Sequence, residues 1–89
     1  MHIVLASLTS RSGAPHRQET LAVVTDLLWA HAVPDDGLEH VRPRRSHDGL
    51  DVYLFVRADD RDLALRQAGS LLDRAAPAMA PHGYELPPH

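Results

Sequence analysis

The sequence predicts a single α+β domain, residues 1–89, built from a four-stranded antiparallel sheet and two helices. Three observations support this fold class. The chain has 89 residues, 44% of them hydrophobic, which is enough for one buried core but not for two. Two segments repeat apolar residues at helical spacing, while the other apolar runs are short enough for strands. These elements follow in the order strand, helix, strand, strand, helix, strand.

The first strand and the first helix are predicted from residues 2–32. Residues 2–8, HIVLASL, form a compact apolar run, and the polar segment TSRSGAP after it is typical of a loop. Pro15 suits the first turn of a helix, and VPDDG ends that helix after Ala32. Trp29 falls at the flank of the apolar face. That face consists of Leu21, Val24, Thr25, Leu28 and Ala32.

A hairpin is predicted from two strands, residues 38–45 and 50–57, joined by SHDG. The first strand lies at the sheet edge, where Pro43 is tolerated if its nitrogen points outward. A two-residue Asp48-Gly49 turn would place Pro43 where a donor is needed. A type I turn with Gly49 in the left-handed conformation avoids this. The expected partners are then Arg45 with Asp51, Pro43 with Tyr53, Val41 with Phe55 and Glu39 with Arg57.

The second half of the chain predicts a helix and a short last strand. Asp59 is expected to cap the helix, with Asp62 at its third position and Pro77 at its end. Prolines bracket a short strand around residues 82–86, so that residues 81–89 form this strand and a tail. The apolar helix face consists of Ala64, Leu65, Ala68, Leu71, Leu72 and Ala75. The whole order is that of ferredoxin-like βαββαβ domains, with both helices on one face of the sheet.

The strand LDVYLFV is apolar on both of its faces, whereas two helices cover only one face of a sheet. The other face would expose an apolar patch of the kind that marks an association or ligand surface. We therefore expect a non-catalytic module that acts through sheet-face homodimerisation or by docking onto a partner protein. The partner- or ligand-facing candidates are His40, Arg42, Arg44, Tyr53 and Phe55. A one-residue shift of the strand register would exchange the two faces, so the sequence does not decide which face the helices cover. The expected register sets Arg42 and Arg44 beside Leu54 and Val52.

The alternative is a small dimeric ligand-binding protein or enzyme. Ferredoxin-like chains that pair sheet to sheet are similar in architecture to dimeric α/β-barrel monooxygenases and cyclases, which implies a cavity between sheet and helices. His40, Arg42, Arg44 or Tyr53 could line such a cavity. No motif predicts catalytic residues, a cofactor or a metal site. His2 and His82 could meet if the first and last strands are neighbours, and the loop SLTSRSGAPH offers a possible anion site, although ordinary loop composition explains it better.

The composition argues against several other classes of function. A formal net charge of −3 argues against nucleic acid, although Tyr53 and Phe55 superficially resemble the stacking aromatics of an RNA-recognition motif. All nine cationic residues are arginine, which is typical of a GC-rich bacterial genome and reduces the weight of the RPRR cluster. There is no cysteine, no basic leader and no apolar run long enough for a membrane span. These features predict a soluble, cytoplasmic protein with no membrane partner.

Overall fold

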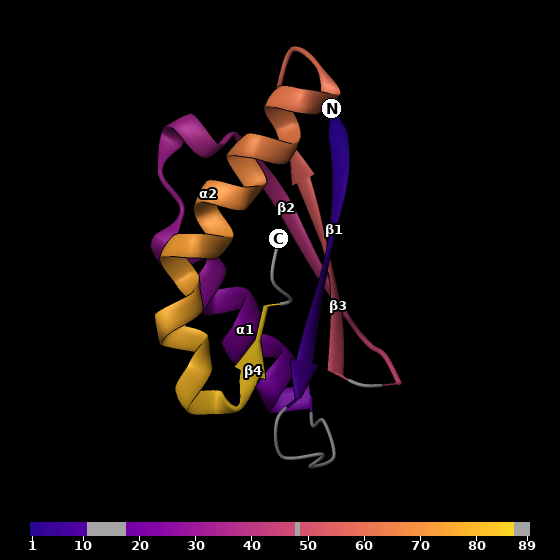
Figure 1. Cartoon of the computed structure of the whole chain (residues 1–89), viewed down its shortest axis with the longest axis vertical. Helices are drawn as coiled ribbons and strands as arrows, with labels where there is room; N and C mark the ends of the chain where they lie inside the picture. Colours follow the sequence, from indigo (N-terminus) through magenta and orange to yellow (C-terminus); the bar gives the residue numbers. More distant parts are fainter. Residues whose placement is uncertain (11–17, 48, 87–89) are drawn as a thin grey trace.

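The computed structural model (Figure 1) describes residues 1–10, 18–47 and 49–86. Its strands and helices follow the expected order, and two short 3-10 helices, η1 and η2, precede the second and fourth strands. The bounds are β1 (His2–Ser10), α1 (Gln18–His31), η1 (Pro34–Asp36), β2 (Leu38–Arg45), β3 (Gly49–Val56), α2 (Arg61–Met79), η2 (Ala80–His82) and β4 (Tyr84–Glu85). The strands form one antiparallel sheet in the order β2-β3-β1-β4. The α+β class is confirmed, and the arrangement is compatible with a ferredoxin-like fold.

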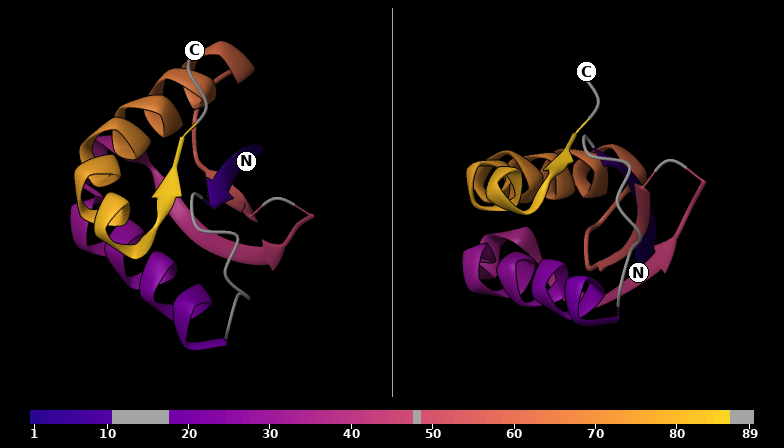
Figure 2. Two further views of the ribbon diagram at one scale, coloured as in Figure 1. Left: turned by 60° about the horizontal axis from the view of Figure 1, so that its bottom comes forward. Right: turned by 90° about the horizontal axis from the view of Figure 1, so that it is seen from below.

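Both helices lie on the same side of the sheet (Figure 2). Under them lie the even-numbered residues of the two central strands, which are buried: Val4, Ala6 and Leu8 of β1, and Leu50, Val52, Leu54 and Val56 of β3. The rest of this core consists of Leu21, Val24 and Leu28 of α1, Val41 of β2, Ala64, Ala68, Leu71, Leu72, Ala75 and Met79 of α2, and Tyr84 of β4. The question of which face the helices cover is thereby answered. The odd-numbered side chains of β1 and β3 point to the opposite, uncovered side.

The hairpin register differs from the expected one by one residue. Arg44, not Arg45, is the partner of Asp51, and Pro43 is the partner of Val52 rather than of Tyr53. Ser46 N donates to Gly49 O over 2.9 Å, so only His47 and Asp48 separate the paired residues, and Asp48 lies outside the described part. The constraint from the proline still holds. Counting from the bonded Ser46–Gly49 pair, Pro43 falls in a non-hydrogen-bonded pair with its nitrogen outward.

Gly49 explains why the expected turn is wrong. Its φ is not positive, so it does not serve as a left-handed turn residue; it is a buried residue at the start of β3. An added Cβ would lie 1.9 Å from Leu8 O and 3.0 Å from Ser10 N. The glycine is therefore needed for the close approach of β1, and the chain reverses before it.

The observed ends of the second helix also differ from the predicted ones. Asp60, not Asp59, caps α2: its Oδ1 accepts from Leu63 N over 2.8 Å. Pro77 lies inside α2 and does not end it; the helix continues to Met79, whose buried side chain packs on the core. The missing N–H of Pro77 removes one intrahelical hydrogen bond near the end of the helix. Leu65, expected in the core, is 46% exposed. Gly83, with a φ of 88°, turns the chain into β4, which is shorter than expected.

Asp36 is buried at the junction between η1 and α2. Its Oδ2 accepts from Val33 N over 2.8 Å and from the guanidinium of Arg74. Gln67 Nε2 donates to Asp36 O over 2.7 Å and to Arg57 O over 3.1 Å. The sequence predicted only that VPDDG ends the first helix. These bonds show that it also ties the connection before β2 to the middle of α2.

Alkaline titration is expected to weaken the fold through Tyr84. Burial raises the pKa of its hydroxyl above the ordinary value of 10.0, because folding favours the neutral phenol. This stabilisation is complete below pH ~10 and is lost as the pH rises through the folded-state pKa. The chain has no lysine or cysteine to titrate in the same range. The melting temperature should therefore fall above pH ~10, and it should fall less in Tyr84→Phe. The control is Tyr53→Phe, which should behave as the wild type does. An equal fall in Tyr84→Phe and the wild type would contradict the prediction.

Candidate functional site

The uncovered side of the sheet, called the open face below, is built from three rows of side chains that run across the strands. The pairings place His40 beside Phe55 and Ile3, Arg42 beside Tyr53 and Leu5, and Arg44 beside Asp51 and Ser7. Both α-helices lie on the other side, so no described helix covers these rows. The first two rows are largely apolar and the third is polar. The open face therefore has an apolar end and a polar end.

All five predicted partner- or ligand-facing residues lie on the open face. His40, Arg42 and Arg44 come from β2, and Tyr53 and Phe55 from β3. The register shift changes their neighbours: Arg42 and Arg44 lie beside Tyr53 and Asp51, not beside Leu54 and Val52, which face the helices. Whether a partner contacts the five residues stays a prediction.

Sequence reasoning missed two members of this surface, Ile3 and Leu5 of β1. They are 49% and 51% exposed, whereas Val4 and Ala6 are buried. The continuous apolar run suggested a strand buried on both sides. The signal that could have found them is parity: the same odd-numbered set continues as Ser7 and Thr9, which are polar and exposed.

Two contacts order the open face. The rings of His40 and Phe55 meet edge to face, with centroids 5.4 Å apart and planes at 63°. At the polar end, Ser7 Oγ donates to Asp51 Oδ1 over 3.0 Å. The face is therefore held by cross-strand contacts between side chains of neighbouring strands.

A pocket of about 340 Å³ opens beside the arginines, lined by Arg42, Pro43, Arg44 and Tyr53. The alternative function predicted an arginine-bearing cavity between the sheet and the helices. The side chains of Arg42 and Arg44 do not lie there. The helix-facing side of the described strands carries the buried aliphatic core, and the arginines are exposed on the other side. A ligand held by Arg42 and Arg44 would bind on the open face.

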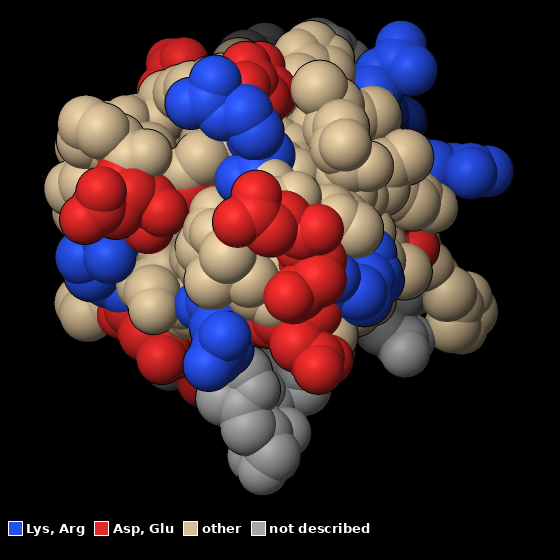
Figure 3. Space-filling model, turned by 90° about the horizontal axis from the view of Figure 1, so that it is seen from above, with Lys and Arg blue, Asp and Glu red and all other residues tan. Residues whose placement is uncertain are grey.

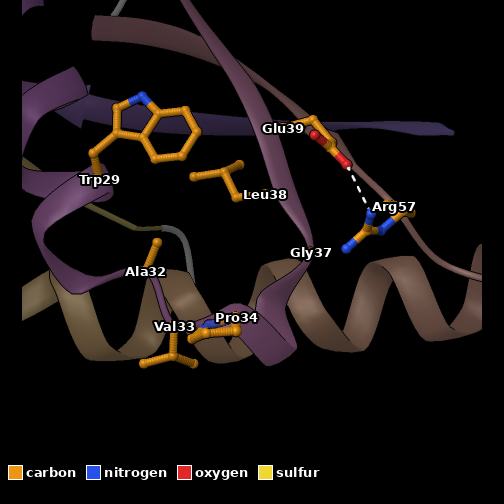
Figure 4. A pocket seen from close by; sticks show the side chains of 8 residues that line it. All are labelled: Trp29, Ala32, Val33, Pro34, Gly37, Leu38, Glu39 and Arg57. Carbon is orange, nitrogen blue, oxygen red and sulfur yellow. Dashed lines mark ion pairs between the residues drawn. The ribbon is translucent and has the colours of Figure 1, made fainter.

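A second pocket, of about 390 Å³, lies where α1, η1 and the start of β2 meet (Figure 4). The ring of Trp29, itself exposed, extends towards Leu38, and Glu39 Oε1 pairs with Arg57 Nη1 over 3.7 Å at the far rim. The pairing of Glu39 with Arg57 was expected from the sequence. Both side chains are well exposed, so the ion pair contributes little stability.

The proposed meeting of His2 with His82 does not occur. The strands β1 and β4 are neighbours, but β4 pairs with Thr9 and Ser10. His2 pairs with Val56 at the opposite end, seven residues or roughly 23 Å along the strand. In the described part of the chain, no three His, Asp or Glu side chains are grouped as metal ligands. The proposed anion site covers residues 7–16: its first four residues belong to β1, and residues 11–16 lie outside the described part.

The charges on the surface are mixed. The end of the molecule where α2 begins shows acidic and basic side chains side by side, without a continuous basic area (Figure 3). None of the described helices is both long enough and apolar enough to cross a membrane.

The fold and the open face together define an α+β domain with one uncovered sheet face. No family model matches the chain, and no curated protein or solved structure is similar enough to indicate a family.

Proposed function

We propose that this chain is a ferredoxin-like, non-catalytic module in which two copies associate through their open faces. The observation that carries the proposal is the exposure of Ile3 and Leu5 beside the rings of Tyr53 and Phe55, on a face that no described helix covers. Covering apolar surface contributes about 25 cal/mol for each Å² removed from water. A cytoplasmic location in a bacterium with a GC-rich genome is part of the same proposal.

The charges of the open face favour a second copy as the occupant. Arg42 and Arg44 lie on β2 at one side of the sheet, whereas Glu85 lies on β4 at the other side. A two-fold axis parallel to the strands sets β2 of one copy over the β1–β4 side of the other. An axis across the strands would instead set arginine over arginine. In the first orientation the arginines of one copy lie towards the glutamate of the other, and the apolar ends of the two open faces meet.

Leu5→Arg is expected to convert the dimer to a monomer. The new charge would lie at the centre of the contact without a partner, which costs several kcal/mol. Sedimentation of the wild type should give about twice the 9.8 kDa mass of the chain, and Leu5→Arg should give the single mass. The matched control is Leu65→Arg, because Leu65 is exposed to a similar extent but lies on α2.

A wild-type chain that sediments as a monomer at high concentration would overturn the proposal. So would a folded Leu5→Arg variant that stays dimeric, because the contact would then lie elsewhere. Circular dichroism of each variant confirms that the fold is intact.

The pocket beside Arg42 and Arg44 favours a ligand-binding dimer as the second candidate function. Two guanidinium groups suit a small anion, which facing sheets would enclose. The same sedimentation runs with added inorganic phosphate separate the candidates: only the ligand-binding function predicts that phosphate tightens the dimer, and that Arg42→Ala removes this effect.

A further inference from the structure

The outer edge of β1 carries backbone groups that no other described strand pairs. The strand β4 covers this edge only at Thr9 and Ser10. Since Ser46 and Gly49 are hydrogen-bonded, odd residues of β3 bond to β2 and even ones bond to β1. By the same alternation, Ile3, Leu5 and Ser7 direct their N–H and C=O groups outward. Of these, Ile3 O accepts from the side chain of Arg61.

The opposite edge of the sheet is protected in a way that this one is not. On β2, Pro43 removes an outward N–H, and the exposed arginines Arg42, Arg44 and Arg45 surround it. Proline and cationic side chains are the usual means of blocking a sheet edge. On β1 the corresponding positions are Ile3 and Leu5, which are apolar and about half exposed. Among the described residues, the β1 edge therefore combines backbone groups that no described strand pairs with apolar side chains, and the β2 edge does not.

The residue after the described end of β4 bears on whether this strand can continue along β1. Continuing the register of Thr9 with Glu85 would set position 87 opposite Ser7 in a hydrogen-bonded pair. Proline occupies position 87 and has no N–H to donate. A continuation of β4 in this register would therefore leave Ser7 O without a backbone donor from position 87.

The helix α2 offers an apolar surface next to the same edge. Arg61 reaches Ile3 O, and Leu65, four residues later, lies on the same stripe of the helix and is 46% exposed. Gly69 continues the stripe, and a Cβ there would meet no atom within 4 Å. A strand added beside β1 would thus find Leu65 and open space on its helix side, and Ile3 and Leu5 on its open-face side.

We propose that the β1 edge binds an extended segment of a partner polypeptide by strand addition. The segment spans about five residues, is apolar on both faces and contains no proline. A second copy that pairs through its own β1 is the competing occupant, and the Leu5 variants below test it. The inference does not depend on the face-to-face dimer, which leaves the sheet edges accessible.

The probe is a fluorescein-labelled heptapeptide in which valine and isoleucine alternate between terminal lysines, with valine at the centre, measured by fluorescence anisotropy on the full chain. Leu5→Pro should bind it at least about tenfold more weakly than the wild type, because an outward N–H is lost where proline is tolerated. Leu5→Ala, which keeps the N–H, should bind within about threefold. Leu65→Arg should weaken binding while leaving the face-to-face dimer intact.

A second measurement needs no change to the protein. Peptides N-methylated at the amides that face β1 should lose binding, and peptides methylated at the alternate amides should keep it. A peptide with proline in place of the central valine has the same charge and should not bind. Equal binding by wild type and Leu5→Pro, insensitivity to the position of methylation, or no binding of the parent peptide would each overturn the inference. So would dimerisation that Leu5→Pro abolishes and Leu5→Ala preserves, since the occupant would then be a second copy.

Discussion

Gly49→Ala should destabilise the domain by at least about 3 kcal/mol. The added methyl group would lie 1.9 Å from Leu8 O and 2.9 Å from Leu8 C, which are backbone atoms of a paired central strand. A backbone carbonyl within a sheet cannot move aside as a flexible side chain can, so relief requires shifting β1 against β3. That shift would disturb the buried contacts of Leu8 and Leu50.

Urea unfolding followed by circular dichroism measures this loss. Gly69→Ala is the matched control, because it makes the same change in a helix with nothing within 4 Å of the new atom. It should stabilise the domain by about 0.5–1 kcal/mol, the helix preference of alanine over glycine. Equal stabilities for the two alanine variants would show that β1 and β3 do not approach as closely as described.

Arg74→Ala should cost about 2–3 kcal/mol. Asp36 is only 4% exposed, and without the guanidinium its carboxylate would keep the bond from Val33 N as its described side-chain contact. The lower end of the range applies because the Arg74 side chain is 39% exposed and water can partly replace it.

Arg66→Ala is the control for this second variant. Arg66 lies on the same helix and is exposed, so its loss should change the unfolding free energy by no more than about 0.5 kcal/mol. Thermal or urea unfolding of both variants gives the comparison. A cost for Arg74→Ala as small as that for Arg66→Ala would mean that the Asp36 junction does not hold η1 to α2.

Element order and type could be predicted from the sequence because apolar periodicity is strong in β1, β3 and both helices. The hairpin register could not, because Gly49 was read as a turn residue. Its actual requirement, the approach of Leu8 O, comes from a strand about forty residues away in the chain, as the partners Gly49 and Thr9 show. Pro43 restricts the register to those with an outward nitrogen, and more than one turn satisfies that condition.

The grouping of the five candidates on one face could not be predicted, because the expected register set Arg42 and Arg44 beside Leu54 and Val52. The observed register, shifted by one residue, brings them beside Tyr53 and Asp51 instead. Ile3 and Leu5 were missed because an apolar run carries no mark of which side is covered. The network around Asp36 was missed because PDDG is sufficient for a turn without any contact to Gln67 or Arg74.

The difference between the two sheet edges limits how this protein can assemble. Pro43 removes a donor from the β2 edge, while in the described part of the chain β1 leaves one short stretch of backbone that no strand pairs. If strand addition occurs as proposed, the expected stoichiometry is one segment per chain. A chain that offers a single pairing edge lacks the second contact that each unit of a fibre needs.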